Sequence, residues 1–442
     1  MFCNPSPSIA AKNHFAVSMI QKMLVCVFAC NCLAISVAQE SRNQTTGLYE
    51  LKGSCLTLIT DIPLDGELRR WPNLLEQSLK QWRSYFGMHA DQFEGLSATL
   101  ILVRDETRFQ DLPSFYDGYQ HGDMLYVRDQ PSEYYRRHLF LHEATHWVMW
   151  HLYGGGGSPW FMEGMAEMQA THSLMDGALS LNKIPLHPKD VQSWGRLAMI
   201  DQNLNQAEAP TLSQILAYEN DRDRTKRYSW SWAACVFFTN HPKTKALLRE
   251  SYQTRLDYSN ELSREFKSKL TDCWGEVEVD WNGFISDLDF GYDWERSMVV
   301  SSKITNEKEL RTRELVTLAT DRGWQSTGLK LQAGKRVQLK SSGKFLLRKR
   351  PADSSQRPWL VEPQGATIEY FRGNPIGCVL ATVVPNEGSE VTKRWETIRV
   401  GSFVTLKPTV SGTLFLKVNE SSNELADNDG KIEVEVSLSS TE

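Results

Sequence analysis

The sequence lacks an excess of positive charge. Its 442 residues include 49 lysines and arginines against 54 aspartates and glutamates, which gives a formal net charge of −5. No dense run of basic residues occurs, so the electrostatic signature of a nucleic-acid-binding protein is missing. Beyond the N-terminal region, no stretch contains the about 18 consecutive apolar residues that indicate a transmembrane span. The composition, 41% apolar and 23% charged, is typical of a globular protein.

The sequence also lacks cysteines at the spacing of a zinc knuckle. Cys55, Cys235, Cys273 and Cys378 are far apart, and the other four of the eight cysteines precede residue 39. The absence of a CxxC pair excludes a cysteine zinc knuckle. In an oxidising compartment the four later cysteines form up to two disulfides or stay as buried free thiols, and the sequence leaves both alternatives open.

The N-terminal residues have the pattern of a secretory signal. Lys22 precedes an apolar run over 23–37, and Ser36-Val37-Ala38 provides small residues at the positions that a signal peptidase reads. The apolar run is short for a membrane span. We therefore predict that residues 1–38 are a signal peptide cleaved after Ala38, which makes the mature protein secreted or periplasmic.

Hydrophobic periodicity divides the remaining chain into two parts. Residues 39–302 read as a small mixed sheet and a helical half. We expect strands at 55–60, 98–103 and 124–128, helices at 72–86 and 133–152, and mostly helices from 160 to 267. Short alternating runs at 336–340, 345–348 and 431–438, punctuated by Gly and Pro, indicate an antiparallel β-sandwich over 312–442. The predicted fold class is α+β, with a domain boundary near 302–312.

The stretch over 136–170 carries the strongest chemical signal. Its segment HEATH places His142 and His146 four residues apart, with Glu143 directly after the first histidine. On a helix that begins after Ser132, the two histidines lie one turn apart, so both imidazoles can reach one metal ion. Glu143 is rotated by one position, near enough to face a metal-bound water. The alternative is an ordinary solvated helix face with two histidines.

The residues that follow favour the metal site. Glycines 154–157 end the helix, Pro159 begins a second one, and Glu163 on its first turn supplies the third ligand that a catalytic zinc needs. Glu167 lies one turn further on, where its carboxylate can accept the outer N–H of a ligand histidine. The alternative is an i,i+4 pair on a polar face. These carboxylates interrupt an apolar sequence, however, in which unpaired burial would be costly.

HEATH, together with the glutamate of WFMEGMAE, resembles the gluzincin metallopeptidases, the superfamily of thermolysin and the M1 aminopeptidases. More closely, it resembles the peptidase-MA-like secreted proteins of bacteria, a domain of unknown function. The resemblance covers residues 50–290 and implies a thermolysin-like catalytic domain. It further implies that His142, His146 and Glu163 bind one catalytic zinc ion.

The same resemblance implies roles for neighbouring residues. Glu143 corresponds to the general base, which takes a proton from the zinc-activated water and delivers it to the leaving amine. Glu167 corresponds to the carboxylate that orients a ligand histidine. His138 and His151 lie outside the pattern, and we expect them to be packing or surface residues.

Two further features of the catalytic domain depend on the resemblance. The segment RYSWSWAACVFF resembles the family's downstream helix that bears a tyrosine, which implies that Tyr228 stabilises the oxyanion. The alternative is a tyrosine packed at the start of a helix. The strand at 124–128 resembles the edge strand on which such enzymes bind an extended substrate.

Three segments of the C-terminal part resemble the galactose-binding-like sandwich of the PA-IL (LecA) lectin type. They are WQSTGLKLQAGKRVQLKSSGKF, NPIGCVLATV and GTLFLKVNESSNELADNDGKIEVEV. The resemblance implies that Glu420, Asp427 and Asn428 bind a Ca²⁺ ion that contacts sugar hydroxyls, and oxygen ligands suit this cation. Glu420 replaces a shorter aspartate of the family, and Glu424 replaces a threonine. The alternative for Asp-Asn-Asp-Gly at 427–430 is a hairpin turn.

Together these features predict a secreted zinc metallopeptidase that acts on a peptide or protein substrate. Zn²⁺ is the expected catalytic cofactor, and Ca²⁺ is a candidate ion of the C-terminal domain, which is expected to contact a carbohydrate or cell-surface ligand. One alternative is a non-catalytic binding protein with a structural zinc, although such a zinc does not need Glu143. Another is a hydrolase of a non-peptide amide.

Overall fold

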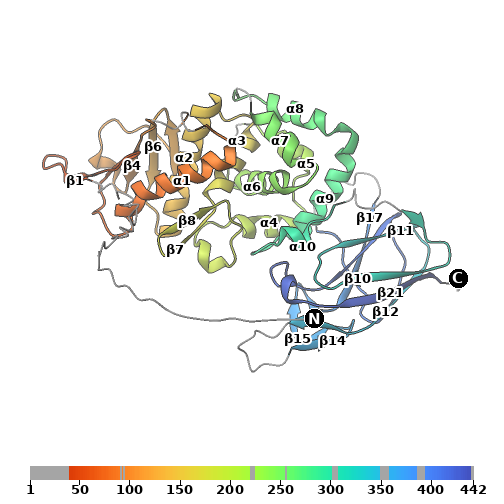
Figure 1. The fold of residues 1–442 in the computed structure, drawn as a ribbon. Coiled ribbons are helices and arrows are strands. Elements are labelled where there is room, and N and C mark those ends of the chain that lie inside the picture. Colours follow the sequence, from red (N-terminus) through yellow and green to blue (C-terminus); the bar gives the residue numbers. More distant parts are fainter. Residues whose placement is uncertain are drawn as a thin grey trace, which may run out of the picture. The chain divides into compact units, whose positions relative to one another are not determined.

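The computed structural model describes residues 39–89, 92, 95–219, 224–253, 256–300, 307–348, 358–385 and 394–439, without the side chains of 224–226. The predicted signal peptide and the first part of the predicted domain boundary, residues 302–306, lie outside these described residues. The described chain has the expected α+β fold, in which a large sheet and many helices precede the two main sheets of the C-terminal part (Figure 1). The domain limits themselves stay predictions.

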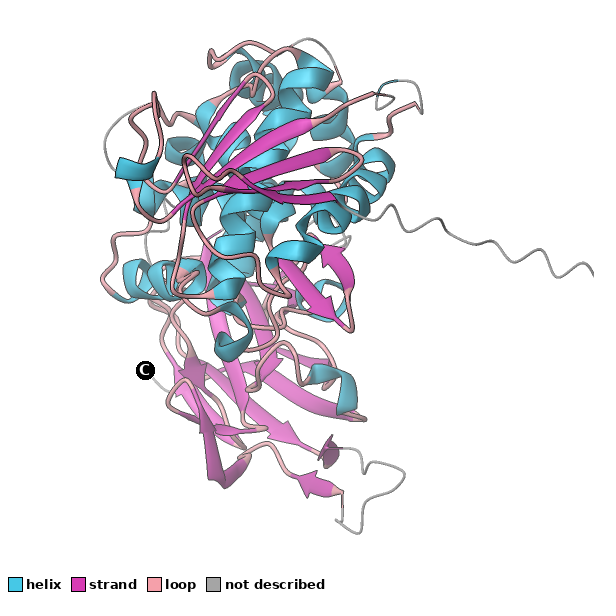
Figure 2. Ribbon diagram, turned by 90° about the vertical axis from the view of Figure 1, so that its left-hand side faces the viewer, coloured by secondary structure: helices cyan, strands magenta, loops and turns pink. Residues whose placement is uncertain are grey.

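Within the described residues, six strands form a mixed sheet in the order β1-β2-β3-β4-β6-β5. Figure 2 shows the strands in magenta and the helices in cyan. The strands are β1 (Gln39–Arg42), β2 (Tyr49–Lys52), β3 (Leu56–Thr60), β4 (Ala98–Val103), β5 (Gly118–His121) and β6 (Met124–Arg128). β3, β4 and β6 run parallel, and β4 is almost wholly buried, as is typical of a central parallel strand. The three strands predicted for this part are confirmed.

The prediction that the strand at 124–128 is the edge strand is wrong. This strand, β6, lies between β4 and β5, and β5 forms the edge of the sheet. The reason is a tight hairpin in which Gly122 and Asp123 connect β5 to β6, with Gly122 at a φ of 56°. Glycine adopts this backbone conformation readily. The free edge of the sheet therefore belongs to β5.

Helix α2 (Glu133–Tyr153) carries the histidines. The Oγ of Ser132 accepts a hydrogen bond from the backbone N–H of Tyr135 at 3.2 Å, which caps the first turn. Gly154, with a φ of 78°, ends the helix. α2 packs against β5 and β6, and α1 (Trp71–Phe86) packs against β3. Both predicted helices are confirmed.

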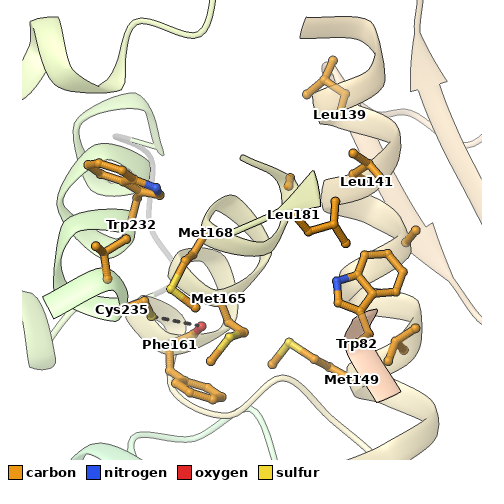
Figure 3. Close-up of a cluster of buried hydrophobic side chains, with 14 of the residues drawn as sticks. Trp82, Leu139, Leu141, Met149, Phe161, Met165, Met168, Leu181, Trp232 and Cys235 are labelled. Carbon is orange, nitrogen blue, oxygen red and sulfur yellow. Dashed lines mark hydrogen bonds between the residues drawn. The ribbon is translucent and has the colours of Figure 1, made fainter. Parts of the chain in front are cut away.

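A dense core fixes α2 relative to α3 (Pro159–Ala170) and α6 (Arg224–Asn240). A Cβ atom on Gly164 of α3 would lie 2.2 Å from the backbone oxygen of Ser231, so only glycine allows α6 to approach this closely. The buried side chains that meet here include Leu141, Met149, Phe161, Met165, Met168, Trp232 and Cys235 (Figure 3). Each large apolar side chain stabilises the fold by about 2 kcal/mol. The helices are thus held rigidly.

A short hairpin and further helices complete this part of the chain. They are β7 (His172–Met175), β8 (Ala178–Leu181), α4 (Arg196–Asn205), α5 (Leu212–Leu216), α7 (Lys245–Tyr252), α8 (Glu261–Lys269), α9 (Trp274–Asp287) and α10 (Trp294–Ser297). The hairpin interrupts a region that the sequence predicted to be mostly helical. Its turn is Asp176-Gly177, with positive φ at both residues, a common two-residue hairpin sequence.

The C-terminal part is a β-sandwich of two main sheets, ordered β10-β21-β12-β19 and β18-β17-β20-β11-β9. The strands are β9 (Lys308–Glu309), β10 (Arg313–Ala319), β11 (Gln325–Leu331), β12 (Val337–Ser342), β13 (Phe345–Arg348), β14 (Trp359–Val361), β15 (Ala366–Phe371), β16 (Asn374–Ile376), β17 (Val379–Pro385), β18 (Ile398–Arg399), β19 (Phe403–Leu406), β20 (Gly412–Val418) and β21 (Lys431–Leu438). In β21 the buried residues Ile432, Val434 and Val436 alternate with more exposed ones. This pattern carried the prediction of a sandwich.

The four cysteines of the described chain are free thiols, so the disulfide alternative is not realised among them. Cys55, Cys235 and Cys378 are buried, and Cys273 is partly exposed. No helix in the described ranges is long and apolar enough to cross a membrane.

Candidate metal centre and cleft

Three side chains from two helices converge on one point. His142 Nε2 lies 3.1 Å from His146 Nε2 and 3.2 Å from Glu163 Oε2, and His146 Nε2 lies 3.5 Å from the same oxygen. Ligands at about 2.0–2.1 Å from a tetrahedral zinc ion are about 3.3 Å from one another. The three atoms therefore have the mutual spacing of three corners of a zinc site.

The three atoms are better satisfied with a divalent cation between them than by contact with one another. Two imidazole nitrogens that face each other at 3.1 Å repel unless a proton or a cation lies between them. The Oε2 of Glu163 is buried without a well-aligned hydrogen bond, which is costly for a carboxylate. A cation would satisfy all three atoms, and two imidazoles with one carboxylate are a ligand set of catalytic zinc.

The charges at this point also favour a cation. Burial lowers the pKa of His142, but the carboxylates of Glu163 and Glu167 outweigh it and raise the pKa to about 10. Burial raises the pKa of Glu163, but His142 and His146 outweigh it and lower the pKa to about 2. Without a metal, His142 therefore holds a proton, which a bound metal ion would displace.

Glu167 lies beneath His142 in a buried network. Its Oε1 is 3.3 Å from His142 Nδ1, an ion-pair contact whose angle is poor for a hydrogen bond, and its Oε2 is 3.1 Å from His138 Nε2. Arg196 donates two hydrogen bonds to this carboxylate, from Nη2 at 2.8 Å and from Nε at 3.0 Å. Burial raises the pKa of Glu167, but Arg196 and His138 outweigh it and keep the carboxyl group ionised.

His138, His142 and Glu167 also place three potential ligand atoms close together. Both oxygens of Glu167, however, already accept hydrogen bonds from Arg196, so a cation here would have to compete with a buried guanidinium. The other ring nitrogen of His138 contacts the backbone oxygen of Ala170 at 3.1 Å. We therefore interpret His138 and Glu167 as a hydrogen-bonded network that supports the candidate ligand His142, and not as part of a separate metal site.

Glu143 faces a cleft of about 630 Å³ beside the three converging atoms. The cleft is lined by β5, by the glycine turn after α2, by the residues after α5 and by the start of α6, including Gly118, Gln120, Gly156, Tyr218 and Arg227. Glu143 is only 6% exposed, and burial raises its pKa, although the neighbouring histidines oppose this. A carboxylate with a raised pKa beside a cleft has the chemistry of a general base.

Tyr228 reaches the same cleft from α6. Its ring centre lies 5.8 Å from that of His142, with the two rings perpendicular, and the residue lines the cleft. The structure thus brings Tyr228, near the start of α6, to the candidate metal ligands. The guanidinium carbon of Arg196 also lies 5.5 Å from the centre of the Tyr228 ring.

The two histidines outside the motif have different surroundings. His151 is partly exposed, and its Nε2 lies 2.7 Å from Asp123 Oδ1, away from the converging atoms. His138 is fully buried and belongs to the Glu167 network. Neither this role of His138 nor the contribution of Arg196 follows from the sequence, because no local motif connects Arg196 to the candidate metal ligands and none predicts the contact between His138 and Glu167.

The candidate calcium residues lie between β20 and β21. Glu420 follows β20, Asp427 ends a short 3-10 helix (Leu425–Asp427), and Asn428 donates from Nδ2 to Glu420 Oε2 at 2.6 Å. Glu420 Oε1 and Asn428 Oδ1 are buried without a hydrogen-bond partner. Burial raises the pKa of Glu420 to about 8. Buried oxygen atoms without donors favour a hard cation.

The hairpin alternative for residues 427–430 is wrong. Two strands joined by a hairpin turn would be neighbours in one sheet, whereas β20 pairs with β11 and β17, and β21 pairs with β10 and β12. The connection therefore crosses from one sheet of the sandwich to the other. Gly430, with a φ of 125°, lies directly before β21.

No protein-family model matches the sequence, and no curated protein matches it. Among solved structures, the chain is similar to the EclA N-terminal domain, described as a PllA-like lectin, with 21% identity, a TM-score of 0.22 and coverage of 29% of this chain and 98% of that one. It is also similar to an aminopeptidase N family protein from Idiomarina loihiensis, with 10% identity, a TM-score of 0.29 and coverage of 91% and 68%. Such low scores leave the function to be argued from the site itself.

Proposed function

We propose that this chain is a secreted zinc-dependent peptidase. The observation that carries the proposal is the convergence of His142 Nε2, His146 Nε2 and Glu163 Oε2 within 3.1–3.5 Å of one another. A structural zinc needs a closed set of four ligands, whereas three ligands beside a cleft leave a position open. Glu143 borders that position, although a structural site has no use for it.

The mechanism follows from the roles of the side chains. Zinc bound at the three atoms would supply Lewis acidity, which lowers the pKa of water and polarises a carbonyl group. Glu143 takes a proton from the attacking water and passes it to the leaving amine. The hydroxyl of Tyr228 donates a hydrogen bond to the oxygen that becomes negatively charged. Glu167 holds His142 in one orientation through Nδ1.

The edge of the sheet supports a peptide as substrate. β5 has no neighbouring strand on its outer side among the described residues, and its residues line the cleft. An extended peptide can add to such an edge through backbone hydrogen bonds, which place its carbonyl groups along the strand. A peptide on β5 would pass Glu143, because Gly118 of this strand touches the Glu143 carboxylate.

The test compares zinc content with hydrolysis. We expect about one zinc per chain in the wild type, loss of zinc in His146→Ala, and retained zinc in Glu143→Gln. A mixed peptide library should be cleaved by the wild type, whereas Glu143→Gln should be slower by several orders of magnitude. Undiminished zinc in His146→Ala would overturn the ligand assignment. Zinc without cleavage of any peptide would favour a non-catalytic binding protein or a hydrolase of another amide.

The buried oxygen atoms of the sandwich favour a second activity. We propose that Glu420, Asp427 and Asn428 hold a Ca²⁺ ion through which the sandwich binds carbohydrate hydroxyl groups. Calcium at 100 times its dissociation constant should then stabilise the protein by about 2.7 kcal/mol. Thermal unfolding with and without CaCl₂ tests this, with Glu420→Gln as the variant and Glu435→Gln, on the half-exposed face of β21, as the control. Equal calcium stabilisation of all three proteins would exclude the site.

A further inference from the structure

Arg196 is a buried cation at the start of α4. The residue is 7% exposed, and its Nη1 donates to the backbone oxygen of Trp194 at 3.2 Å. Its Nε and Nη2 donate two parallel hydrogen bonds to Glu167, at 3.0 and 2.8 Å. Glu167 is 1% exposed, so this is a fully buried pair with defined geometry on both sides. Such a bidentate pair fixes orientation as well as distance.

Through Glu167, this arginine reaches a candidate zinc ligand. Glu167 Oε1, which accepts from Arg196 Nη2 at 2.8 Å, is also the oxygen that lies 3.3 Å from His142 Nδ1. The angle at which the carboxylate meets the imidazole therefore depends on the guanidinium behind it. Without Arg196, a buried carboxylate would share its charge only with two histidines and would lose its fixed orientation.

The same guanidinium contacts the candidate oxyanion donor. Its central carbon lies 5.5 Å from the centre of the Tyr228 ring, within the range of a cation–π contact. Tyr228 in turn lies across from His142, with perpendicular rings. The side chain of Arg196 thus contacts two separate parts of the site, which come from α3 and α6.

We propose that Arg196 is a positioning residue. It fixes His142 through Glu167, and Tyr228 through direct contact, and so holds these two side chains in a defined position relative to each other. The inference rests on the proposed peptidase function. Arginine suits this role because its planar group forms a forked pair with a carboxylate and at the same time stacks on an aromatic face, which the point charge of lysine does not do. A site whose ligand and donor are held by one rigid group is preorganised before substrate binds.

The experiment uses Arg196→Lys and Arg196→Met in the full chain. Zinc affinity, measured by competition with a chelator, should weaken roughly 10- to 100-fold, as for other residues that orient a metal ligand. At saturating zinc, kcat should still be lower by roughly 10-fold with little change in KM, because Tyr228 is misplaced. This remaining loss should vanish when Arg196→Lys is made in a Tyr228→Phe background, since the hydroxyl is then already absent.

The matched control is Arg136→Lys. Arg136 is as buried as Arg196, at 6%, and pairs with Glu67 and Asp129, but it contacts neither Glu167 nor Tyr228 in the described contacts. It should change stability and leave zinc affinity and kcat unchanged. If Arg196→Lys behaves as this control does, or if its kcat loss persists in Tyr228→Phe, the positioning role is wrong. A wild type without zinc or hydrolysis would instead overturn the proposed function, which the Arg196 variants do not address.

Discussion

Gly118 on β5 and Glu143 on α2 touch: a Cβ atom on Gly118 would lie 2.2 Å from Glu143 Oε1. The edge strand therefore runs directly over the candidate general base. Because Glu143 Oε1 is at the far end of a flexible side chain, a methyl group at position 118 would displace this carboxylate rather than the backbone. The absence of a side chain at position 118 thus allows the Glu143 carboxylate to occupy its present position.

We therefore predict that Gly118→Ala lowers kcat/KM roughly 100-fold, since small misplacements of a reacting group cost about this much. Zinc content should not change, because Gly118 contacts no ligand atom in the described contacts. Gly66→Ala is the control, since a Cβ there would have open space around it. Steady-state kinetics on one cleaved peptide decide the matter, and full activity in Gly118→Ala would mean that Glu143 is not the base.

Tyr228→Phe should lower kcat by about 100- to 1,000-fold and leave KM nearly unchanged, because an oxyanion donor acts mainly in the transition state. The phenyl ring keeps the perpendicular contact with His142 and the contact with Arg196, so zinc affinity and stability should persist. An unchanged kcat would mean that Tyr228 only packs against its neighbours and does not stabilise the oxyanion.

The sequence points to the candidate metal ligands because the spacing between them is local. His142 and His146 are related by one helical turn, so helix periodicity predicts that their side chains approach. Glu163 follows across a glycine turn on the next helix, and the family resemblance implies its place beside them. Arg196 joins the site only through tertiary packing, which no spacing encodes. His138 precedes His142 by four residues on α2, so helix periodicity places it on the same face, but no spacing encodes its contact with Glu167. The contacts of Arg196 with Glu167 depend on how α4 lies against α3, and the contact of His138 with Glu167 depends on how α2 lies against α3.

β5 was not predicted, but the sequence does contain a local signal for it. Residues 118–121 and 124–128 are separated by two residues, Gly122-Asp123, and Gly-Asp between two short runs is typical of a tight hairpin. Applied to this pair, the rule predicts β5 and moves the sheet edge away from β6. The same rule, applied to Asp176-Gly177, predicts the hairpin of β7 and β8.

Glu167→Ala should weaken zinc affinity by roughly 10- to 100-fold without abolishing it, because His142 Nδ1 loses its ion-pair contact with the carboxylate. It should also destabilise the fold by about 3–5 kcal/mol, since Arg196 would be left as an unpaired buried charge. Glu167→Gln keeps an acceptor oxygen and should give the smaller change in both quantities. Chelator competition and chemical denaturation measure the two effects separately, and an unchanged dissociation constant for zinc would show that Glu167 does not orient His142.

His172 is held in its neutral form by its surroundings. Its Nδ1 donates to the backbone oxygen of Ala170 at 2.8 Å, and its Nε2 accepts from Arg137 Nε at 3.3 Å. A second proton would have to sit on Nε2 and face a guanidinium. Burial, together with Arg137, lowers the pKa of His172 from 6.5 to about 3.

This pKa makes the folded state weaker in acid. Between pH 6.5 and 3 the unfolded chain protonates His172 while the folded protein does not, so the free energy of unfolding falls as the pH falls, by about 3 kcal/mol at pH 4.5. His172→Gln should remove this part of the pH dependence, whereas His187→Gln, at an exposed position, should keep it. Denaturant unfolding of the metal-free proteins between pH 7 and 4.5 measures the slopes, and any other titrating group contributes equally to all three. Parallel slopes for wild type and His172→Gln would mean that His172 takes up its proton in the folded protein as readily as in the unfolded chain.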